Sequence, residues 1–144
     1  MSRDLHEDTT TAVRLRLALV RLTRALRSGN TAELSPSQLS ALATIDEYGP
    51  LRLNAVAEHE SVGAPVATRV VASLEELGLV KRGDDPLDKR ASLVRLSSQG
   101  QETIDMIWKR RTLGLSSRLD VLTPQERETI EAALPALERM AREP

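Results

Sequence analysis

Apolar residues recur at helical spacing along most of the chain, and the clearest case is the segment 64–77. One side of this predicted helix carries apolar residues at spacings of three, four and three: Ala67, Val70, Leu74 and Leu77. The other side carries residues that are small or polar: Pro65, Thr68, Arg69, Ala72 and Glu76. Gly78 follows as the left-handed residue that ends a helix. The pattern predicts a slim helix with one side on a core and the other exposed.

A short helix precedes this one, and a hairpin follows it. The short helix covers residues 54–59, with Asn54 as its N-cap, and the turn 60–63 joins the two helices. Beyond Gly78, two short strand patterns at 78–82 and 91–96 are separated by a loop at 83–86 that contains Gly, Asp and Pro. A helix-turn-helix followed by a hairpin is a winged helix-turn-helix, whose helix is narrow enough for a DNA major groove.

A long helix is predicted near the start of the chain, from caps among residues 9–11 to Arg27, after a frayed segment 1–8. It carries two adjacent apolar stripes, one of Ala12, Leu15, Leu19, Leu22 and Leu26 and one of Val13, Leu17 and Val20. Two stripes exceed what one packing contact on a small domain requires. We therefore assign one stripe to the core and the other to a subunit interface, although a buried helix in a monomer would show the same pattern.

The next helix begins with a capping box, in which Ser35 caps, Pro36 takes the first helical position and Gln38 bonds back. It ends near Tyr48, and residues 51–53 form a minimal strand beside the hairpin. Together these residues are a strong signal for the start of a helix.

Two more helices are predicted after the hairpin. One starts at 96–101, and the last starts at a second capping box formed by Thr123 and Glu126. Pro135 lies inside the last helix and predicts a kink. The predicted fold is mainly α with a small β-hairpin wing. Its regions are an N-terminal dimerisation helix at 1–30, a winged helix-turn-helix at 31–98 and C-terminal dimerisation helices at 99–144, intertwined as one domain.

Composition excludes several classes of function. The chain has no cysteine, which excludes disulfides and thiolate metal ligands. No apolar run approaches the roughly 20 residues that span a membrane, so we expect a cytoplasmic protein with no membrane contact. The two histidines, His6 and His59, are expected at the surface, with no metal or cofactor. No phosphate loop or nucleophile–base pair indicates an enzyme.

Charge is distributed unevenly although the net charge is only −1. Residues 81–95 contain five basic residues against three acidic ones, which places a cationic patch on the hairpin. Tyr48 and Trp108 are the only aromatic residues, which argues against a base-stacking surface for single strands. An ordinary solvated hairpin, with Arg69 paired to Glu76, would have the same composition, so charge alone leaves both interpretations open.

Three motifs in register resemble the MarR (multiple antibiotic resistance regulator) family of bacterial transcription factors. They are residues 34–38, residues 65–80 and the wing segment 88–100, which begins Asp88–Lys89–Arg90. The resemblance covers almost the whole chain. It implies a homodimer on a pseudo-palindromic operator of double-stranded DNA, with recognition helices in major grooves roughly 34 Å apart.

The resemblance also implies roles for individual residues. In the family the wing aspartate holds its arginine by a salt bridge while the arginine enters the minor groove, and here these are Asp88 and Arg90. Gly63 and Ala64 replace the family's usual serine cap and arginine, and Val66 replaces a polar residue. The predicted DNA-binding residues are Asn54, Ala64, Pro65, Val66, Thr68, Arg69, Ser73, Arg82, Asp88, Lys89 and Arg90.

The departures from the family pattern predict an operator recognised partly through apolar contact. Arg69 is the candidate for bidentate binding to guanine, whereas Val66 and Thr68 are placed to meet thymine methyl groups. Arg90 is expected to supply much of the affinity. The function predicted in this way is a DNA-binding regulator, most simply a repressor.

The resemblance implies a small aromatic acid that releases the regulator by binding between the dimerisation helices and the winged region, where Arg14, Arg16 and Tyr48 are candidate contacts. Two other functions use the same elements. The exposed helix of a winged module can bind a protein partner without sequence-specific DNA binding. A non-specific architectural DNA binder is disfavoured by the near-neutral charge. Steep salt dependence distinguishes a DNA partner from a protein partner.

Overall fold

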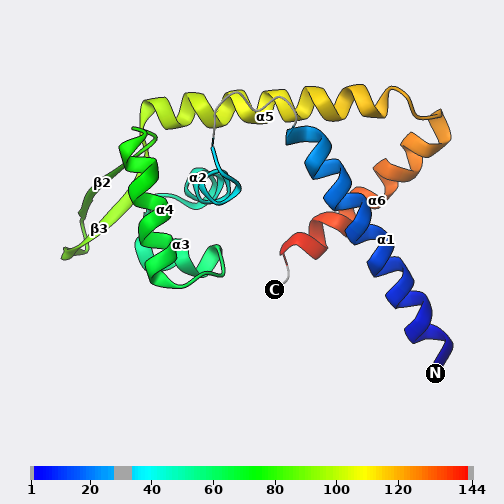
Figure 1. The fold of residues 1–144 in the computed structure, drawn as a ribbon, viewed down its shortest axis with the longest axis horizontal. Coiled ribbons are helices and arrows are strands. Elements are labelled where there is room, and N and C mark those ends of the chain that lie inside the picture. Colours follow the sequence, from blue (N-terminus) through cyan, green and yellow to red (C-terminus); the bar gives the residue numbers. More distant parts are fainter. Residues whose placement is uncertain (1, 28–33, 143–144) are drawn as a thin grey trace. The chain divides into compact units, whose positions relative to one another are not determined.

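The structure is a computed structural model that describes the backbone of residues 2–27 and 34–142, and the side chains from Thr10 onward within those ranges (Figure 1). Its elements are α1 (Ser2–Arg27), α2 (Pro36–Tyr48), β1 (Leu51–Arg52), α3 (Leu53–His59), α4 (Ala64–Glu76), β2 (Val80–Asp85), β3 (Asp88–Leu96), α5 (Ser98–Leu119) and α6 (Pro124–Arg142). They form two compact units. The winged unit lies within residues 27–109, and the helical unit lies within residues 1–26 and 110–144.

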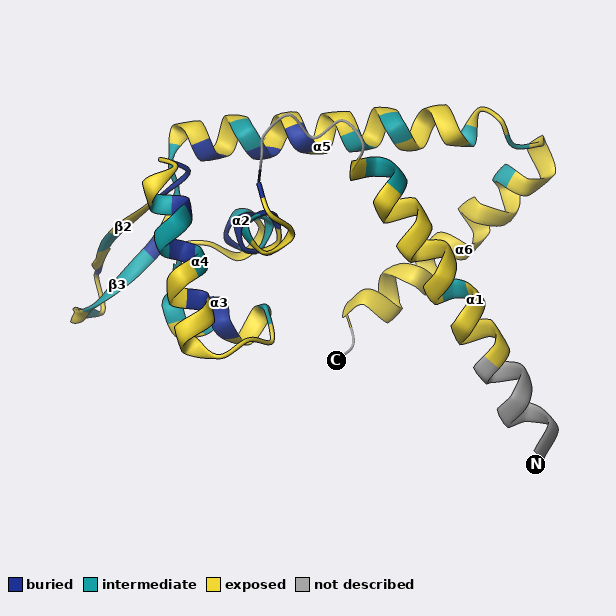
Figure 2. Ribbon diagram, viewed as in Figure 1, coloured by how far each residue is buried: buried dark blue, intermediate teal, exposed yellow. Residues whose placement is uncertain are grey.

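The winged unit has a closed hydrophobic core (Figure 2). Its fully buried side chains come from α2, α3, α4, β3 and the first half of α5: Leu42, Ile45, Val56, Val71, Leu74, Val94 and Ile104. Burying each one stabilises the fold by about 1.5–3 kcal/mol. Because Ile104 and Ile107 belong to this core, the compact winged unit reaches Lys109, eleven residues beyond the predicted boundary at 98. The other predicted boundary, at residues 30–31, lies outside the described residues.

The predicted start of α2 is confirmed in detail. The Gln38 main-chain N–H donates to Ser35 Oγ at 3.2 Å, and the Ser35 N–H donates to Gln38 Oε1 at 2.8 Å. Pro36 occupies the first turn, where its missing N–H costs no helical bond. Gly78 has a φ of +73° and follows α4 as predicted.

The sheet is antiparallel, with strand order β1-β3-β2. The predicted minimal strand is confirmed, since Leu51 pairs with Val94. The predicted hairpin loop was too long, because Gly83, Asp84 and Asp85 belong to β2 and only Pro86 and Leu87 remain as the turn. Cross-strand bonding continues to the pair Asp85–Asp88 and overrides the local turn propensity of Gly and Asp.

Three predictions about helix ends and faces were wrong. Arg52, not Asn54, is the N-cap of α3, because pairing of β1 with β3 holds Arg52 in an extended conformation. Val71 is buried, whereas Leu77 is 47% exposed because the helix ends at Glu76 and the chain turns there. α1 begins at Ser2, so the segment 2–8 is helical rather than frayed.

The helical unit consists of α1, the second half of α5 and α6. Its second capping box is confirmed, with the Thr123 N–H donating to Glu126 Oε2 at 2.9 Å and the Glu126 N–H to Thr123 Oγ1 at 3.2 Å. α6 continues through Pro135 as one helix. Both stripes of α1 are largely exposed, including Leu19 and Leu22 of the first stripe and Val13 and Val20 of the second. Among the described residues of this unit, none is buried.

Candidate nucleic-acid interface

The exposed face of α4 is the first part of the candidate site. Ala67, Val71 and Leu74 are buried beneath the helix, which leaves five predicted contact residues exposed. They are Ala64, Pro65, Val66, Thr68 and Arg69. Asn54 is also exposed, in the first turn of α3. The helical spacing of the apolar residues therefore leaves these side chains on the exposed face, as the sequence predicted.

One hydrogen bond links α2 to α4, and a second bond within α4 holds the hydroxyl that accepts it. The Gln38 Nε2 donates to Ser73 Oγ at 3.1 Å, and the Ser73 hydroxyl donates to the Val70 carbonyl at 2.7 Å. Ser73 is only partly exposed, and both its donor and its acceptor are used inside the protein. These bonds make Ser73 a positioning residue for α4, and its role as a base contact stays a sequence prediction.

The N-terminus of α4 presents apolar surface. Gly63 is the N-cap and offers no side-chain oxygen, while its carbonyl accepts the N–H groups of Val66 and Ala67 at 3.0 and 3.1 Å. Pro65 has no N–H. Val62 and Val66 are 39% and 40% exposed beside it. Few polar groups are thus available at this end, which suits contact with methyl groups better than contact with phosphate.

Arg69 is the main candidate for polar recognition on α4, and this role stays a prediction. The Thr68 hydroxyl donates to the Ala64 carbonyl at 2.7 Å, which uses its only donor. Within residues 10–27 and 34–142, Arg69 makes no ion pair, so the alternative pairing with Glu76 is absent. The planar guanidinium of Arg69 is therefore available for two hydrogen bonds to one guanine edge.

Two acidic side chains, Asp85 and Asp88, hold the tip of the wing, and Asp85 was not among the predicted site residues. Asp85 is 5% exposed and accepts the Leu87 N–H at 2.9 Å and the Arg52 Nε–H at 2.7 Å. The Leu87 N–H holds the pKa of the Asp85 carboxyl below its usual value, and the Arg52 guanidinium acts in the same direction, while desolvation opposes them. Residue spacing gives no signal for this contact, because Arg52 and Asp85 are 33 residues apart.

Asp88 has a different partner from the one that the family resemblance implied. Its Oδ1 accepts the main-chain N–H of Arg90 at 3.0 Å, and its Oδ2 lies 4.0 Å from the Arg52 guanidinium. In the part of the chain that the structure describes, Asp88 makes no salt bridge with the Arg90 side chain. The Asx-type bond fixes the main chain after the turn and leaves the Arg90 guanidinium uncommitted.

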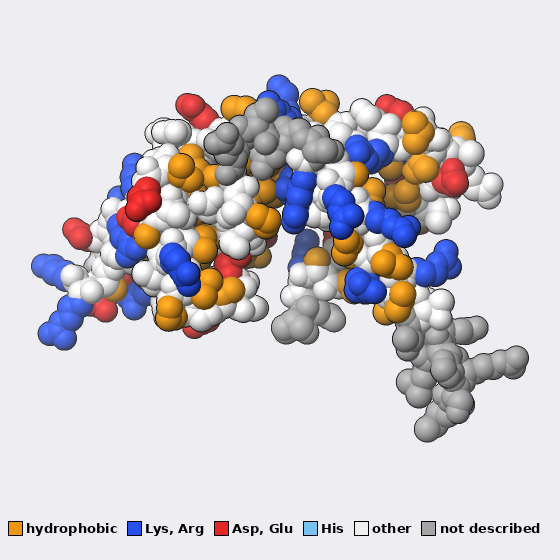
Figure 3. Space-filling model, viewed as in Figure 1, with side chains coloured by type: hydrophobic (Ala, Val, Ile, Leu, Met, Phe, Trp, Pro, Cys, Tyr) orange, Lys and Arg blue, Asp and Glu red, His pale blue; other side chains and the backbone are white. Residues whose placement is uncertain are grey.

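The basic residues of the wing fall into two groups. Arg82 donates to Glu75 Oε2 at 3.0 Å and so ties β2 to α4, which reduces its value as a DNA contact. Lys89 and Arg90 are exposed and, among the described residues, form no ion pair. Lys and Arg side chains project at the wing end of the winged unit (Figure 3).

A cross-strand pair adds two cations that were missed as site residues. Lys81 lies directly opposite Arg95, and both side chains are exposed. Like charges directly opposite each other destabilise a sheet, so an anionic partner such as phosphate would relieve the pair. Only the strand register, which depends on the hairpin turn, brings these two residues together.

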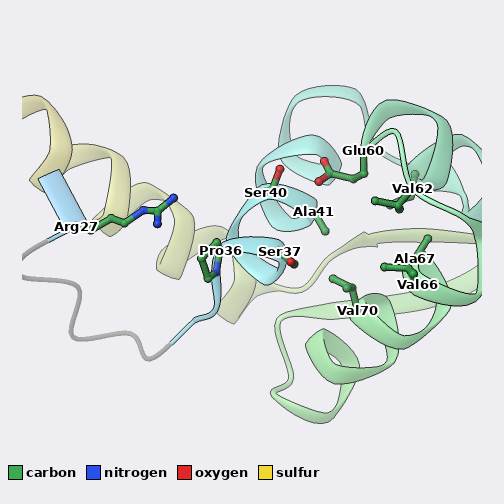
Figure 4. A pocket seen from close by; sticks show the side chains of 11 residues that line it. Arg27, Pro36, Ser37, Ser40, Ala41, Glu60, Val62, Val66, Ala67 and Val70 are labelled. Atoms are coloured by element: carbon green, nitrogen blue, oxygen red, sulfur yellow. The ribbon is translucent and has the colours of Figure 1, made fainter. Parts of the chain in front are cut away.

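A pocket of about 400 Å³ lies beside α4 (Figure 4). Its lining comes mainly from α2 (Pro36, Ser37, Ser40, Ala41), from Val56, Glu60 and Val62, and from α4 (Val66, Ala67, Val70), with Arg27 at the end of α1. The predicted ligand contacts Arg14, Arg16 and Tyr48 do not line it. The Tyr48 ring instead stacks on His59, with ring centroids 4.3 Å apart.

Comparison with known proteins identifies this arrangement. The MarR family model matches residues 34–92, which include α2, the helix-turn-helix and most of the wing. A helix-turn-helix transcriptional regulator of Mycobacterium tuberculosis is 39% identical over 130 residues, covering 90% of this chain and 91% of that protein. The chain belongs to the MarR family. It is a DNA-binding transcriptional regulator, and the family is not one of enzymes.

Solved structures of MarR-like proteins share the fold. A putative transcriptional regulator from Pseudomonas aeruginosa superposes with a TM-score of 0.81 at 30% identity, covering 96% of this chain and 98% of its own. A MarR family protein from Bacillus stearothermophilus gives 0.81 at 24% identity, with 95% and 98% covered. The predicted winged helix-turn-helix with N- and C-terminal helices is thereby confirmed. In this MarR protein, no helix among the described residues is long and apolar enough to span a bilayer.

Proposed function

We propose that this MarR-family regulator is a homodimeric repressor that binds a pseudo-palindromic operator in the cytoplasm through α4 and the wing. The observation that carries the proposal is the grouping of uncommitted cations. Arg69 on α4 and Lys89 and Arg90 on the wing are exposed, and among the described residues they have no acidic partner. A narrow helix beside a cationic hairpin fits a major groove and the adjacent minor groove.

Exposed apolar surface supports the homodimer. In the helical unit, large apolar side chains of α1 and α6 are at least 36% exposed: Val13, Leu17, Leu19, Val20, Leu22, Ile130, Leu134, Leu137 and Met140. Exposed apolar patches of this extent mark protein interfaces. A second copy of the chain would supply the same surface in return, and a two-fold dimer matches a palindromic site.

Repression is the direction of control that we infer. The transcriptional repressor MdtR of Bacillus subtilis is 27% identical over 75% of this chain. A protein that covers an operator blocks polymerase without needing a further activation surface, so repression is the simplest consequence of operator binding. The alternative function, a protein-interaction module without sequence-specific DNA binding, has no support among the comparisons.

Release by a small aromatic acid is the third part of the proposal. BpsR of Bordetella bronchiseptica, which shares the fold at 22% identity, has its DNA binding regulated by 6-hydroxynicotinic acid. Here the pocket beside α4 offers the apolar side chains of Val62, Val66 and Val70 and the hydroxyls of Ser37 and Ser40. A ligand that prefers one position of α4 would shift DNA affinity. Arg14, Arg16 and Tyr48 stay a sequence prediction.

The test uses an operator found by genome-wide footprinting of the full-length protein. Fluorescence anisotropy over a salt series should give a steep linear fall of log affinity with log salt. Arg90→Ala should weaken binding at physiological salt by about tenfold and reduce the salt slope by about one, because one cation is lost. Lys109→Ala, an equal charge change on α5, is the matched control and should bind like the wild type.

Two results would contradict the proposal. Failure of footprinting to return any protected site would remove operator binding altogether. Equal affinity of Arg90→Ala and wild type would remove the wing from the interface. For the ligand, titration with salicylate-like acids should release the wild type from DNA. The same acids should not release Val70→Trp, because its larger side chain fills the pocket.

A further inference from the structure

The tip of the wing carries an apolar side chain that nothing in the winged unit covers. Leu87 is 93% exposed, more than any other large apolar residue in the described part of the chain. A single exposed leucine is common at protein surfaces and by itself indicates nothing. The case for a function comes from how this leucine is held and from what surrounds it.

The main chain on both sides of Leu87 is fixed by side-chain bonds. Before it, Pro86 fixes its own φ. The Leu87 N–H donates to Asp85 Oδ1, and the same carboxylate is held by Arg52. After it, the Arg90 N–H donates to Asp88 Oδ1. Such a tip loses little conformational freedom on contact, which is the condition for a preorganised binding element.

The surroundings of Leu87 select the class of partner. Lys89 and Arg90 follow directly, and in the described residues neither has an ion pair. Arg52 forms ion pairs with Asp85 and, at 4.0 Å, with Asp88, so Lys89 and Arg90 are the cations beside the leucine that no carboxylate of the described residues neutralises. An apolar side chain next to unpaired cations fits a narrow, electronegative surface with apolar walls, and the minor groove of DNA has both features.

We propose that Leu87 is an apolar wedge that enters the operator minor groove beside Arg90 and partly unstacks a base step there. The proposal rests on the proposed operator binding. It extends that function by adding a position of specificity that involves no base hydrogen bond. Pyrimidine–purine steps, TA and CA/TG, open most readily, so each half-site should carry one under the wing tip. Asp85 and Asp88 are the positioning residues of the wedge.

The experiment compares Leu87→Ala with Val121→Ala on the footprinted operator. Val121 is 82% exposed and belongs to neither the wing nor α4, so it is a matched loss of exposed apolar surface. Affinity is measured by anisotropy over a salt series, and DNA bending by energy transfer between end labels. Leu87→Ala should bind about tenfold more weakly, with an unchanged salt slope and a smaller bend. Val121→Ala should match the wild type.

A second arm changes the DNA instead of the protein. Replacing the flexible step under the wing by AA should weaken the wild type by about tenfold but leave Leu87→Ala unaffected, because the variant no longer opens that step. Both variants should melt like the wild type, since neither side chain is buried. These results together would support a wedge.

Several results would overturn it. If Leu87→Ala bound and bent the operator like the wild type, Leu87 would make no contact with DNA. If it bound more weakly without a change in bending or step preference, Leu87 would contact DNA without unstacking a base step. Loss of binding to vesicles of anionic lipid in Leu87→Ala, with DNA binding unchanged, would assign the tip to a membrane surface. Absence of DNA binding by the wild type would instead count against the proposed function itself, so the two failures are distinguishable.

Discussion

At the scale of single residues, the candidate interface combines polar side chains that have no ion-pair partner in the part of the chain that the structure describes with others that already have a partner. Arg69, Lys89 and Arg90 are exposed without ion pairs in the described residues, as a DNA interface requires. Ser73 and Arg82 belong to residue types that contact DNA, yet their polar groups bind Gln38 and Glu75 instead. Those partners come from other elements, so no local pattern could have identified them.

Asp85 gives a prediction at this scale, because its pKa is lowered in the folded protein. A lowered folded pKa means that the carboxylate stabilises the fold above the unfolded pKa of about 3.9, and that this contribution is lost as pH falls through the folded value. Asp85→Asn should therefore lower the Tm at pH 7. The difference from wild type should narrow below about pH 4, as followed by circular dichroism melts.

Asp84→Asn is the control for this experiment. Asp84 is the exposed neighbour of Asp85 and makes no ion pair in the described part of the chain, so its variant should melt like the wild type at every pH. A constant gap between Asp85→Asn and wild type from pH 7 to pH 3 would show that the effect is steric rather than electrostatic.

At the scale of elements, Gln38 links α2 to α4 by a side-chain hydrogen bond. It completes the capping box of α2 and donates to Ser73 on α4. The sequence predicted the first role from the spacing Ser35–Gln38, which lies within one helical turn. The second role required the packing of α2 against α4, across 35 residues of chain.

Gln38→Ala should therefore destabilise the protein by more than the loss of a helix cap alone would. We expect the free energy of unfolding in urea to fall by about 1–2 kcal/mol, from the lost cap bond and the Ser73 hydroxyl left with one partner fewer. Gln125→Ala, in the first turn of α6, is the matched control and should change stability by less than about 0.5 kcal/mol. Equal effects of the two substitutions would contradict the role of Gln38 between the helices.

At the scale of the whole molecule, the two units differ in how much they bury. The winged unit closes a core of its own, while none of the described side chains of the helical unit is fully buried (Figure 2). The large apolar residues of α1 and α6 thus have no partner core within their own unit. This imbalance is the reason to expect a dimer, and it makes the oligomeric state a direct test.

Sedimentation equilibrium should give a mass about twice the 15.8 kDa of one chain. Leu19→Glu places a charge on exposed apolar surface of α1, where Leu19 is 51% exposed, and should yield monomers. These monomers should lose affinity for the full operator but not for an isolated half-site, because only the pairing of two sites is lost. Val121→Glu, the same type of change outside α1 and α6, should stay dimeric.

The sequence by itself determined where most elements lie and which side of α4 is exposed, because capping boxes, glycine stops and helical periodicity are signals within a few residues. It also carried the motifs of the MarR family. Only the tertiary structure decided the N-cap of α3, the length of the hairpin, the partners of Ser73, Arg82 and Asp85, and the pairing of Lys81 with Arg95. Each of these depends on cross-strand pairing or on contacts between elements distant in the chain, and local propensity contains no information about either.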